Sequence, residues 1–87
     1  MLVKPQFEAG RVEASREKGV IRDPVVRRTA IAGVIDAFAA GGAAIMGLMV
    51  SPLLGAEGNV EFLAHFVPGG EAVGDADELI SRVVGEA

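Results

Sequence analysis

The chain has 87 residues and a formal net charge of −4, and 51% of its residues are apolar. A length of this order holds at most one small domain with a modest core. The chain has no cysteine and one histidine, which excludes a disulfide framework, a thiolate metal site and a zinc site built from histidines. This composition favours a cytoplasmic protein without a bound metal.

The first expected element is a short strand, Leu2–Lys4. Pro5 ends it, because proline lacks the N–H that a sheet requires and keeps the preceding residue extended. Lys4 therefore stands at a strand end, where a sheet commonly meets its ligand. The charged, glycine-containing segment 6–22 is predicted to be a long surface loop.

The next element is a helix that begins at Asp23-Pro24, an N-cap acid followed by a proline at the first helical position. Gly41-Gly42 provides the stop. Apolar side chains recur between these signals at helical spacing, so one face is expected to pack on a sheet. The stripe consists of Val26, Ala30, Ile31, Val34, Ile35 and Phe38.

Two strands are expected after this helix, at residues 43–50 and 59–67, with the turn "LLGAEG" between them. The short connection predicts that the strands are antiparallel neighbours. Met46 and Met49 are expected to fill gaps in the core. His65 lies on a strand that should be central, where core packing and a catalytic role are the two alternatives. An amphipathic helix capped by Asp75 or Asp77 is predicted to complete the chain.

Residues 37–56 carry no charge, and twenty residues could cross a bilayer. Gly41-Gly42 and Ser51-Pro52 divide this stretch into three pieces, which we interpret as a helix end, a buried strand and a turn. The pattern argues against a membrane span. The order strand, loop, helix, antiparallel strand pair and helix is typical of the second half of an α/β domain, since a lone first strand needs a sheet to join.

Two segments, "LVKPQFEAG" and "SPLLGAEGNVEFL", separated by a helix introduced by "RDP", resemble the C-terminal half of the TlyA (hemolysin A-like) proteins, members of the FtsJ-type ribose 2′-O-methyltransferases. The resemblance covers residues 1–67, and residues 68–87 form a linker and a C-terminal helix. It implies the C-terminal half of a Rossmann-like S-adenosylmethionine-dependent methyltransferase domain, with the last strand inserted antiparallel between its neighbours.

The family carries a lysine–aspartate–lysine–glutamate tetrad, and the resemblance places Lys4 on the second lysine and Glu61 on the glutamate. If the strand 59–67 runs antiparallel beside Leu2–Lys4, then Lys4 and Glu61 should meet at one edge within reach of an ion pair. A plain pair at a strand end is the structural alternative. In the family's chemistry Lys4 would take the proton of a ribose hydroxyl or orient that hydroxyl, and Glu61 would position both.

The resemblance also implies partners. The cofactor-binding half and an S4-like RNA-binding domain have no counterpart in these residues, so we expect a fragment of the enzyme that is inactive alone and uses S-adenosylmethionine only in the full-length protein. Ribosomal RNA is the expected substrate, and Arg11, Arg22 and Asn59 are the candidate RNA contacts. The rival hypotheses are a non-enzymatic module that pairs or self-associates through its open strand edge, and a membrane-active hemolysin.

Overall fold

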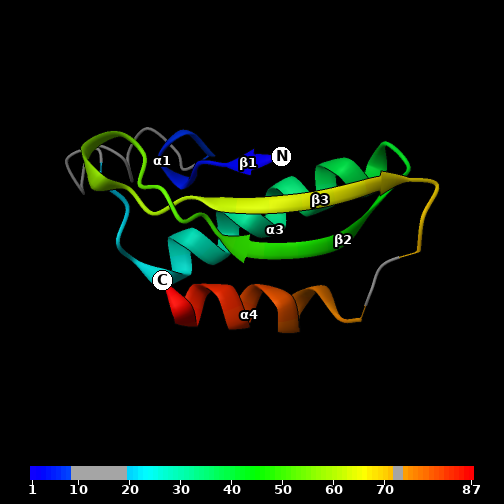
Figure 1. Ribbon diagram of the computed structural model, residues 1–87. Coiled ribbons are helices and arrows are strands. Elements are labelled where there is room, and N and C mark those ends of the chain that lie inside the picture. Colours follow the sequence, from blue (N-terminus) through cyan, green and yellow to red (C-terminus); the bar gives the residue numbers. More distant parts are fainter. Residues whose placement is uncertain (9–19, 72–73) are drawn as a thin grey trace.

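The computed structural model describes residues 1–8, 20–71 and 74–87. The chain forms a three-stranded sheet with a helix layer on one side (Figure 1). Its strands are β1 (Leu2–Val3), β2 (Ala43–Val50) and β3 (Phe62–Pro68). Its helices are α1 (Pro5–Glu8), α3 (Pro24–Ala40), the short 3₁₀ turn η1 (Ala56–Gly58) and α4 (Ala76–Glu86). The expected α/β order of elements is confirmed, and the Rossmann-like half-domain stays a prediction.

The last strand, β3, lies between the other two, in the order β1-β3-β2, and is antiparallel to both. This is the arrangement that the resemblance implied. Leu63 pairs with Leu2 on one side and with Met49 on the other. A register irregularity between Ile45 and Gly47 leaves Met46 without a partner in the β2–β3 ladder. The structure therefore confirms both of the antiparallel pairings predicted from the sequence.

Both long helices begin at the predicted caps. The side chain of Asp23 accepts a hydrogen bond from Val25 N at 2.9 Å, and that of Asp75 accepts one from Asp77 N at 2.8 Å. Each bond satisfies a backbone N–H that has no partner inside the helix. α3 ends at Gly41 as expected.

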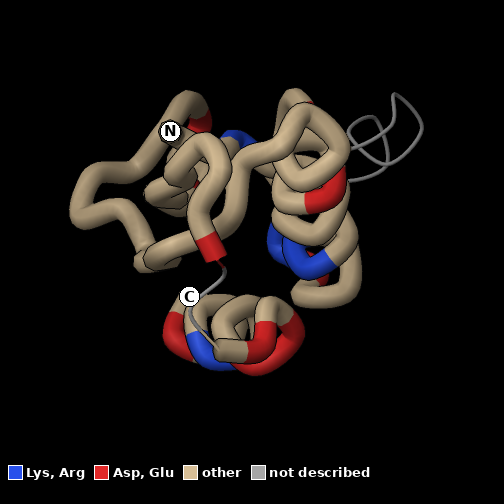
Figure 2. Tube along the Cα trace, turned by 90° about the vertical axis from the view of Figure 1, so that its right-hand side faces the viewer, with Lys and Arg blue, Asp and Glu red and all other residues tan. Residues whose placement is uncertain are grey.

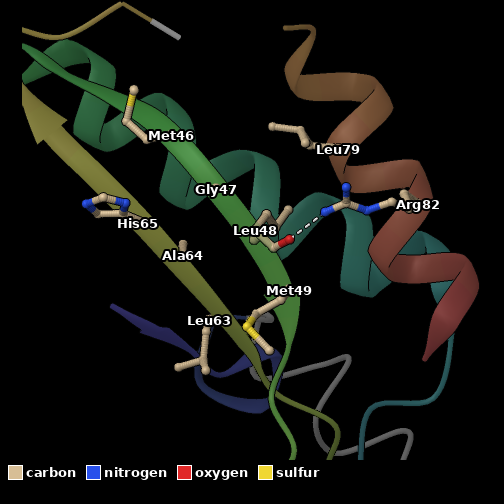
Figure 3. Close-up of a pocket in the computed structure, with 9 residues that line it drawn as sticks. All are labelled: Met46, Gly47, Leu48, Met49, Leu63, Ala64, His65, Leu79 and Arg82. Carbon is tan, nitrogen blue, oxygen red and sulfur yellow. Dashed lines mark hydrogen bonds between the residues drawn. The ribbon is translucent and has the colours of Figure 1, made fainter. Parts of the chain in front are cut away.

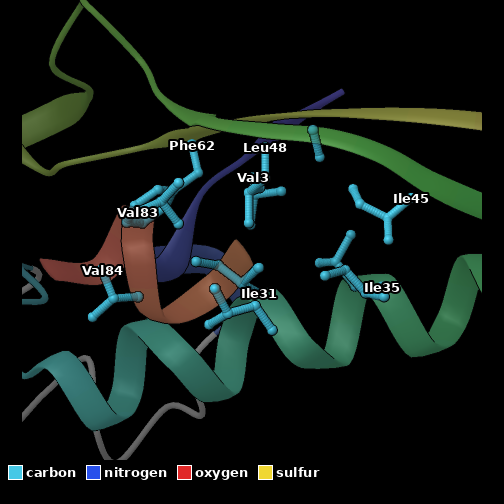
Figure 4. Close-up of a cluster of buried hydrophobic side chains, with 11 residues drawn as sticks. Val3, Ile31, Ile35, Ile45, Leu48, Phe62, Val83 and Val84 are labelled. Atoms are coloured by element: carbon cyan, nitrogen blue, oxygen red, sulfur yellow. The ribbon is translucent and has the colours of Figure 1, made fainter. Parts of the chain in front are cut away.

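One hydrophobic core joins the sheet to α3 and α4 (Figure 4). Phe62 of β3 is completely buried, as are Ile31 of α3 and Val83 of α4. Both helices present the apolar side chains that their spacing predicted. The core consists of Val3, Ile31, Val34, Ile35, Ile45, Leu48, Phe62, Ala64, Ile80, Val83 and Val84. α3 therefore packs on one face of the sheet, with α4 beside it.

Two local predictions are wrong, for Pro5 and Met49, and one of the two alternatives for His65, core packing, is excluded. Pro5 begins the helical turn α1, where a loop was expected, because a proline with φ near −65° suits a first helical position as well as a strand end. Met49 and His65 lie exposed on the sheet face opposite α3, not in the core. Among the described segments no helix covers this second face, so alternate residues of the strands meet solvent.

The uncharged stretch 37–56 divides as predicted into the end of α3, strand β2 and the loop that leads to η1. In the described segments, no helix is both long enough and apolar enough to span a membrane.

Candidate functional site

The candidate site lies where the chain leaves β1 and enters β3. Leu2 faces Leu63 and Val3 faces Phe62 in the antiparallel ladder. The same register sets Lys4 opposite Glu61, just beyond the last paired residues. The backbone N–H of Ser51 donates to Glu61 O at 2.8 Å, so the start of β3 is also held to the end of β2.

The expected ion pair between Lys4 and Glu61 is wrong. Lys4 Nζ lies 5.6 Å from the centroid of the Phe7 ring, while Glu61 Oε2 accepts a hydrogen bond of 2.7 Å from Gln6 Nε2. The cause is α1: the N–H groups of Phe7 and Glu8 donate to Lys4 O, which turns the chain back at the strand end. This turn carries Gln6 to the carboxyl group and the Phe7 ring to the ammonium group. The two side chains share one strand end without a direct contact.

Glu61 is buried, with 4% of its surface exposed, which is unusual for an acidic residue. Gln6 donates a hydrogen bond to Oε2 of the carboxyl group, and the backbone of Gly55 lies close to the same group. A Cβ atom added at Gly55 would lie 3.0 Å from Glu61 Oε1 and closer still to Oε2 and Cδ. The loop between β2 and β3 therefore contacts the carboxyl group directly through its backbone.

Asn59 holds this loop in place. Its Oδ1 accepts a hydrogen bond of 2.8 Å from Ile21 N, and its Nδ2 donates one of 2.8 Å to Ala56 O. Gly55 N donates to Asn59 O at 2.8 Å, which closes the loop across η1. Asn59 is 1% exposed. Its side chain thus joins Ile21 to the loop, and the predicted contact of Asn59 with RNA stays a prediction.

The other two predicted RNA contacts, Arg22 and Arg11, also stay predictions. Arg22 is exposed, whereas Arg11 lies outside the described residues. Two further arginines in the first turn of α3 make hydrogen bonds within the chain. Arg27 Nε donates to Ile21 O at 3.1 Å, and Arg28 Nη2 donates to Ser81 Oγ at 2.9 Å. Figure 2 shows basic residues towards one end of α3 and acidic residues along α4. These two arginines link α3 to its neighbours.

A groove of about 490 Å³ lies on the open sheet face beside β2 and β3, towards α4 (Figure 3). Apolar side chains line most of it, among them Met46, Leu63 and Leu79. His65 lies on β3 at its rim. Arg82 Nη2 donates to Leu48 O at 2.7 Å and so satisfies a carbonyl group on the outer edge of β2. The described segments contain no cluster of three acidic or histidine side chains that could hold a metal ion.

Gln6 and Gly55 were missed as site residues by the sequence analysis. Both stand inside the two segments that carried the resemblance, but the first was assigned to a loop and the second to a turn. Gln6 lies only two positions after Lys4, the proposed catalytic lysine. This closeness was the one signal in the sequence that could have marked Gln6 as a site residue.

No protein-family model matches the chain. The candidate rRNA methyltransferase YqxC of Bacillus subtilis is 47% identical over 89 aligned positions, which cover 99% of this chain and 31% of that protein. Hemolysin A of Brachyspira hyodysenteriae is 41% identical over 66 positions, covering 76% of this chain and 27% of that protein. The chain thus spans less than a third of the length of these relatives.

Two solved structures share the fold. A candidate hemolysin from Lactococcus lactis superimposes with a TM-score of 0.84 at 38% identity, covering 98% of this chain and 40% of that one. A candidate hemolysin from Streptococcus thermophilus gives a TM-score of 0.85 at 35% identity, with 98% and 30% covered. The three-stranded sheet and its helices are therefore part of a larger protein in these two structures.

Proposed function

We propose that this chain, which is related to the hemolysin A-like (TlyA) proteins over part of their length, supplies one portion of an rRNA ribose 2′-O-methyltransferase. The observation that carries the proposal is the 47% identity to a protein named as an rRNA methyltransferase, over 99% of this chain. The position of Lys4 and Glu61 at one strand end supports it, since the resemblance assigns both to the catalytic tetrad.

In this proposal Lys4 acts on the ribose hydroxyl. A hydroxyl oxygen becomes a competent nucleophile when a base removes its proton, and a neutral amine can accept that proton. Lys4 is half-buried at a strand end, with its backbone fixed by the pairing of β1 with β3 and by the turn of α1. Glu61 keeps a carboxyl group in a buried position beside it, where it can accept hydrogen bonds and orient the sugar.

The described residues do not fit S-adenosylmethionine. β1 is followed by Lys4-Pro5 and α3 is preceded by Asp23-Pro24, so neither junction offers a glycine-rich turn whose N–H groups could approach a nucleotide. We therefore assign cofactor binding to the larger part of the enzyme, in keeping with relatives of which this chain matches 31% and 27%. On this account the chain alone does not transfer methyl groups.

Complementation tests this account. The 87-residue chain is mixed or co-expressed with the preceding portion of a full-length relative, and transfer of tritiated methyl groups from S-adenosylmethionine to rRNA is measured. We expect methyl transfer only when both parts are present, and calorimetry should detect cofactor binding only then. Methyl transfer by the chain alone would refute the division of labour, and its absence from the assembly would refute the proposed function.

The open sheet face favours a second candidate, a module that binds another protein without catalysis. Leu2, Leu63 and Met49 form a row across the three strands, with exposed fractions of 40%, 36% and 52%. An apolar row of this kind is typical of an interaction surface. Sedimentation of the isolated chain, compared with Leu63→Lys and Met49→Lys variants, tests this candidate: self-association that both variants abolish would support it.

A further inference from the structure

The carboxyl group of Glu61 lies against two residues that come from separate elements. Gln6 belongs to α1, directly after β1, and Gly55 belongs to the loop between β2 and β3. They are 49 positions apart in the sequence and contact the same buried carboxyl group. Such contacts can either fill the space around Glu61 or fix the orientation of its carboxyl group.

Gly55 is required for space and not for backbone conformation. Its φ of −84° and ψ of −165° are available to any residue. The nearby Gly58, by contrast, has a φ of +79°. A methyl group at Gly55 would overlap the carboxyl group of Glu61, the far end of a side chain that can rotate. An alanine would therefore leave the backbone intact and push the carboxyl group out of its position.

Gln6 is an unfavourable residue for stability at this position. Its Nε2 donates to Glu61 Oε2 at 2.7 Å, but its Oε1 is buried and has no hydrogen-bond partner in the described part of the chain. A buried acceptor without a partner loses its hydrogen bonds to water on folding and gains none in return. In native proteins such groups are rare and call for an explanation, which a functional site often provides.

We propose that Gln6 and Gly55 are positioning residues for Glu61. Gln6 fixes Oε2 with its amide, and the missing side chain of Gly55 lets the carboxyl group lie against the loop backbone, so that the acid stays at the strand end beside Lys4. The part of this inference that concerns catalysis rests on the proposed methyltransferase function. The part that concerns the orientation of the carboxyl group does not.

The orientation is tested on the 87-residue chain itself. Gln6 is the only glutamine and Asn59 the only asparagine, so a nitrogen-15 spectrum contains just two side-chain amide groups. We expect the Gln6 amide protons to exchange with solvent about tenfold more slowly than in the unfolded chain, and Gly55→Ala to remove this protection. Gly33→Ala is the matched control, because nothing lies within 4 Å of its added methyl group.

The Asn59 amide reports on folding in the same spectrum. If it stays protected in Gly55→Ala while Gln6 loses protection, the change is confined to the carboxyl group. Equal protection of Gln6 in the wild-type chain and in Gly55→Ala would overturn the proposal. A Glu61→Ala variant gives an independent check, since it should expose the Gln6 amide to exchange without any crowding at Gly55.

The catalytic part is tested in the assembled enzyme of the complementation experiment. We expect Gly55→Ala to lower kcat by about 100-fold, the loss that a misplacement of about 1 Å can cause, while KM changes by less than about twofold. Gln6→Met, which keeps the side-chain length without the donor, should lower kcat by a smaller factor. Wild-type kcat in both variants would refute the positioning role. An inactive wild-type assembly would refute the methyltransferase function, and amide exchange would still decide the orientation.

Discussion

Replacing Glu61 by glutamine should stabilise the chain. The carboxyl group is 4% exposed and accepts one hydrogen bond from the described side chains, that of Gln6 at 2.7 Å. An acidic group buried with so little compensation costs more than a neutral amide of the same shape. We expect Glu61→Gln to raise the free energy of unfolding by about 1 kcal/mol, the size of a net hydrogen bond. For a domain of this length that is about 5 °C in Tm.

Urea unfolding followed by circular dichroism at neutral pH measures this change as a shift of the midpoint at constant slope. Glu57→Gln is the matched control: it removes an equal charge from the same loop, but Glu57 is exposed and the change should stay within about 0.5 kcal/mol. A Glu61→Gln chain that is less stable than the wild type by about 1 kcal/mol or more would contradict the reasoning. It would mean that the carboxylate of Glu61 stabilises the folded chain.

Three further predictions concern the scaffold that positions the site, and urea midpoints measure all of them. Asp23→Ala removes the cap bond to Val25 N and should destabilise the chain by about 1 kcal/mol; an unchanged midpoint would show that the cap contributes nothing. Gly33→Ala, at an exposed position of α3, should stabilise the chain by about 0.5–1 kcal/mol, and a lower urea midpoint would contradict the open space around Gly33. Phe62→Ala should cost about 3–5 kcal/mol because Phe62 is fully buried; a cost below about 1 kcal/mol would argue against this core.

Much of the fold could be predicted because local signals decide it. Asp23-Pro24 and Gly41 bound α3, and Asp75 caps α4, through interactions within a few residues. The inserted position of β3 came from the resemblance, and the short β2–β3 connection independently predicted one of its two pairings. Here local chemistry and the family pattern agree with the structure.

The missed features depend on tertiary context. Alternation in β3 separated Phe62 and Ala64 from Leu63 and His65, but it could not tell that α3 and α4 both lie on the side of Phe62. Met49 was therefore assigned to a core that does not exist on its face, and core packing, one of the two alternatives for His65, is excluded for the same reason.

The candidate site was predicted in outline and not in its contacts. The register brought Lys4 and Glu61 to one strand end, as expected. The turn of α1 places Gln6, and not Lys4, in contact with the carboxyl group of Glu61. This contact was not predicted, because a sequence pattern does not distinguish a four-residue helical turn from a loop.

The most direct test of the account is methyl transfer to rRNA by the assembled enzyme carrying Lys4→Ala. Lys4 is the residue proposed to act on the ribose hydroxyl, and its side chain packs only partly into the protein, so its removal should leave the fold intact. We expect turnover to fall by about 100-fold or more, with calorimetry showing unchanged binding of S-adenosylmethionine. Wild-type turnover by the Lys4→Ala assembly would contradict the central claim that this strand end is part of a methyltransferase active site.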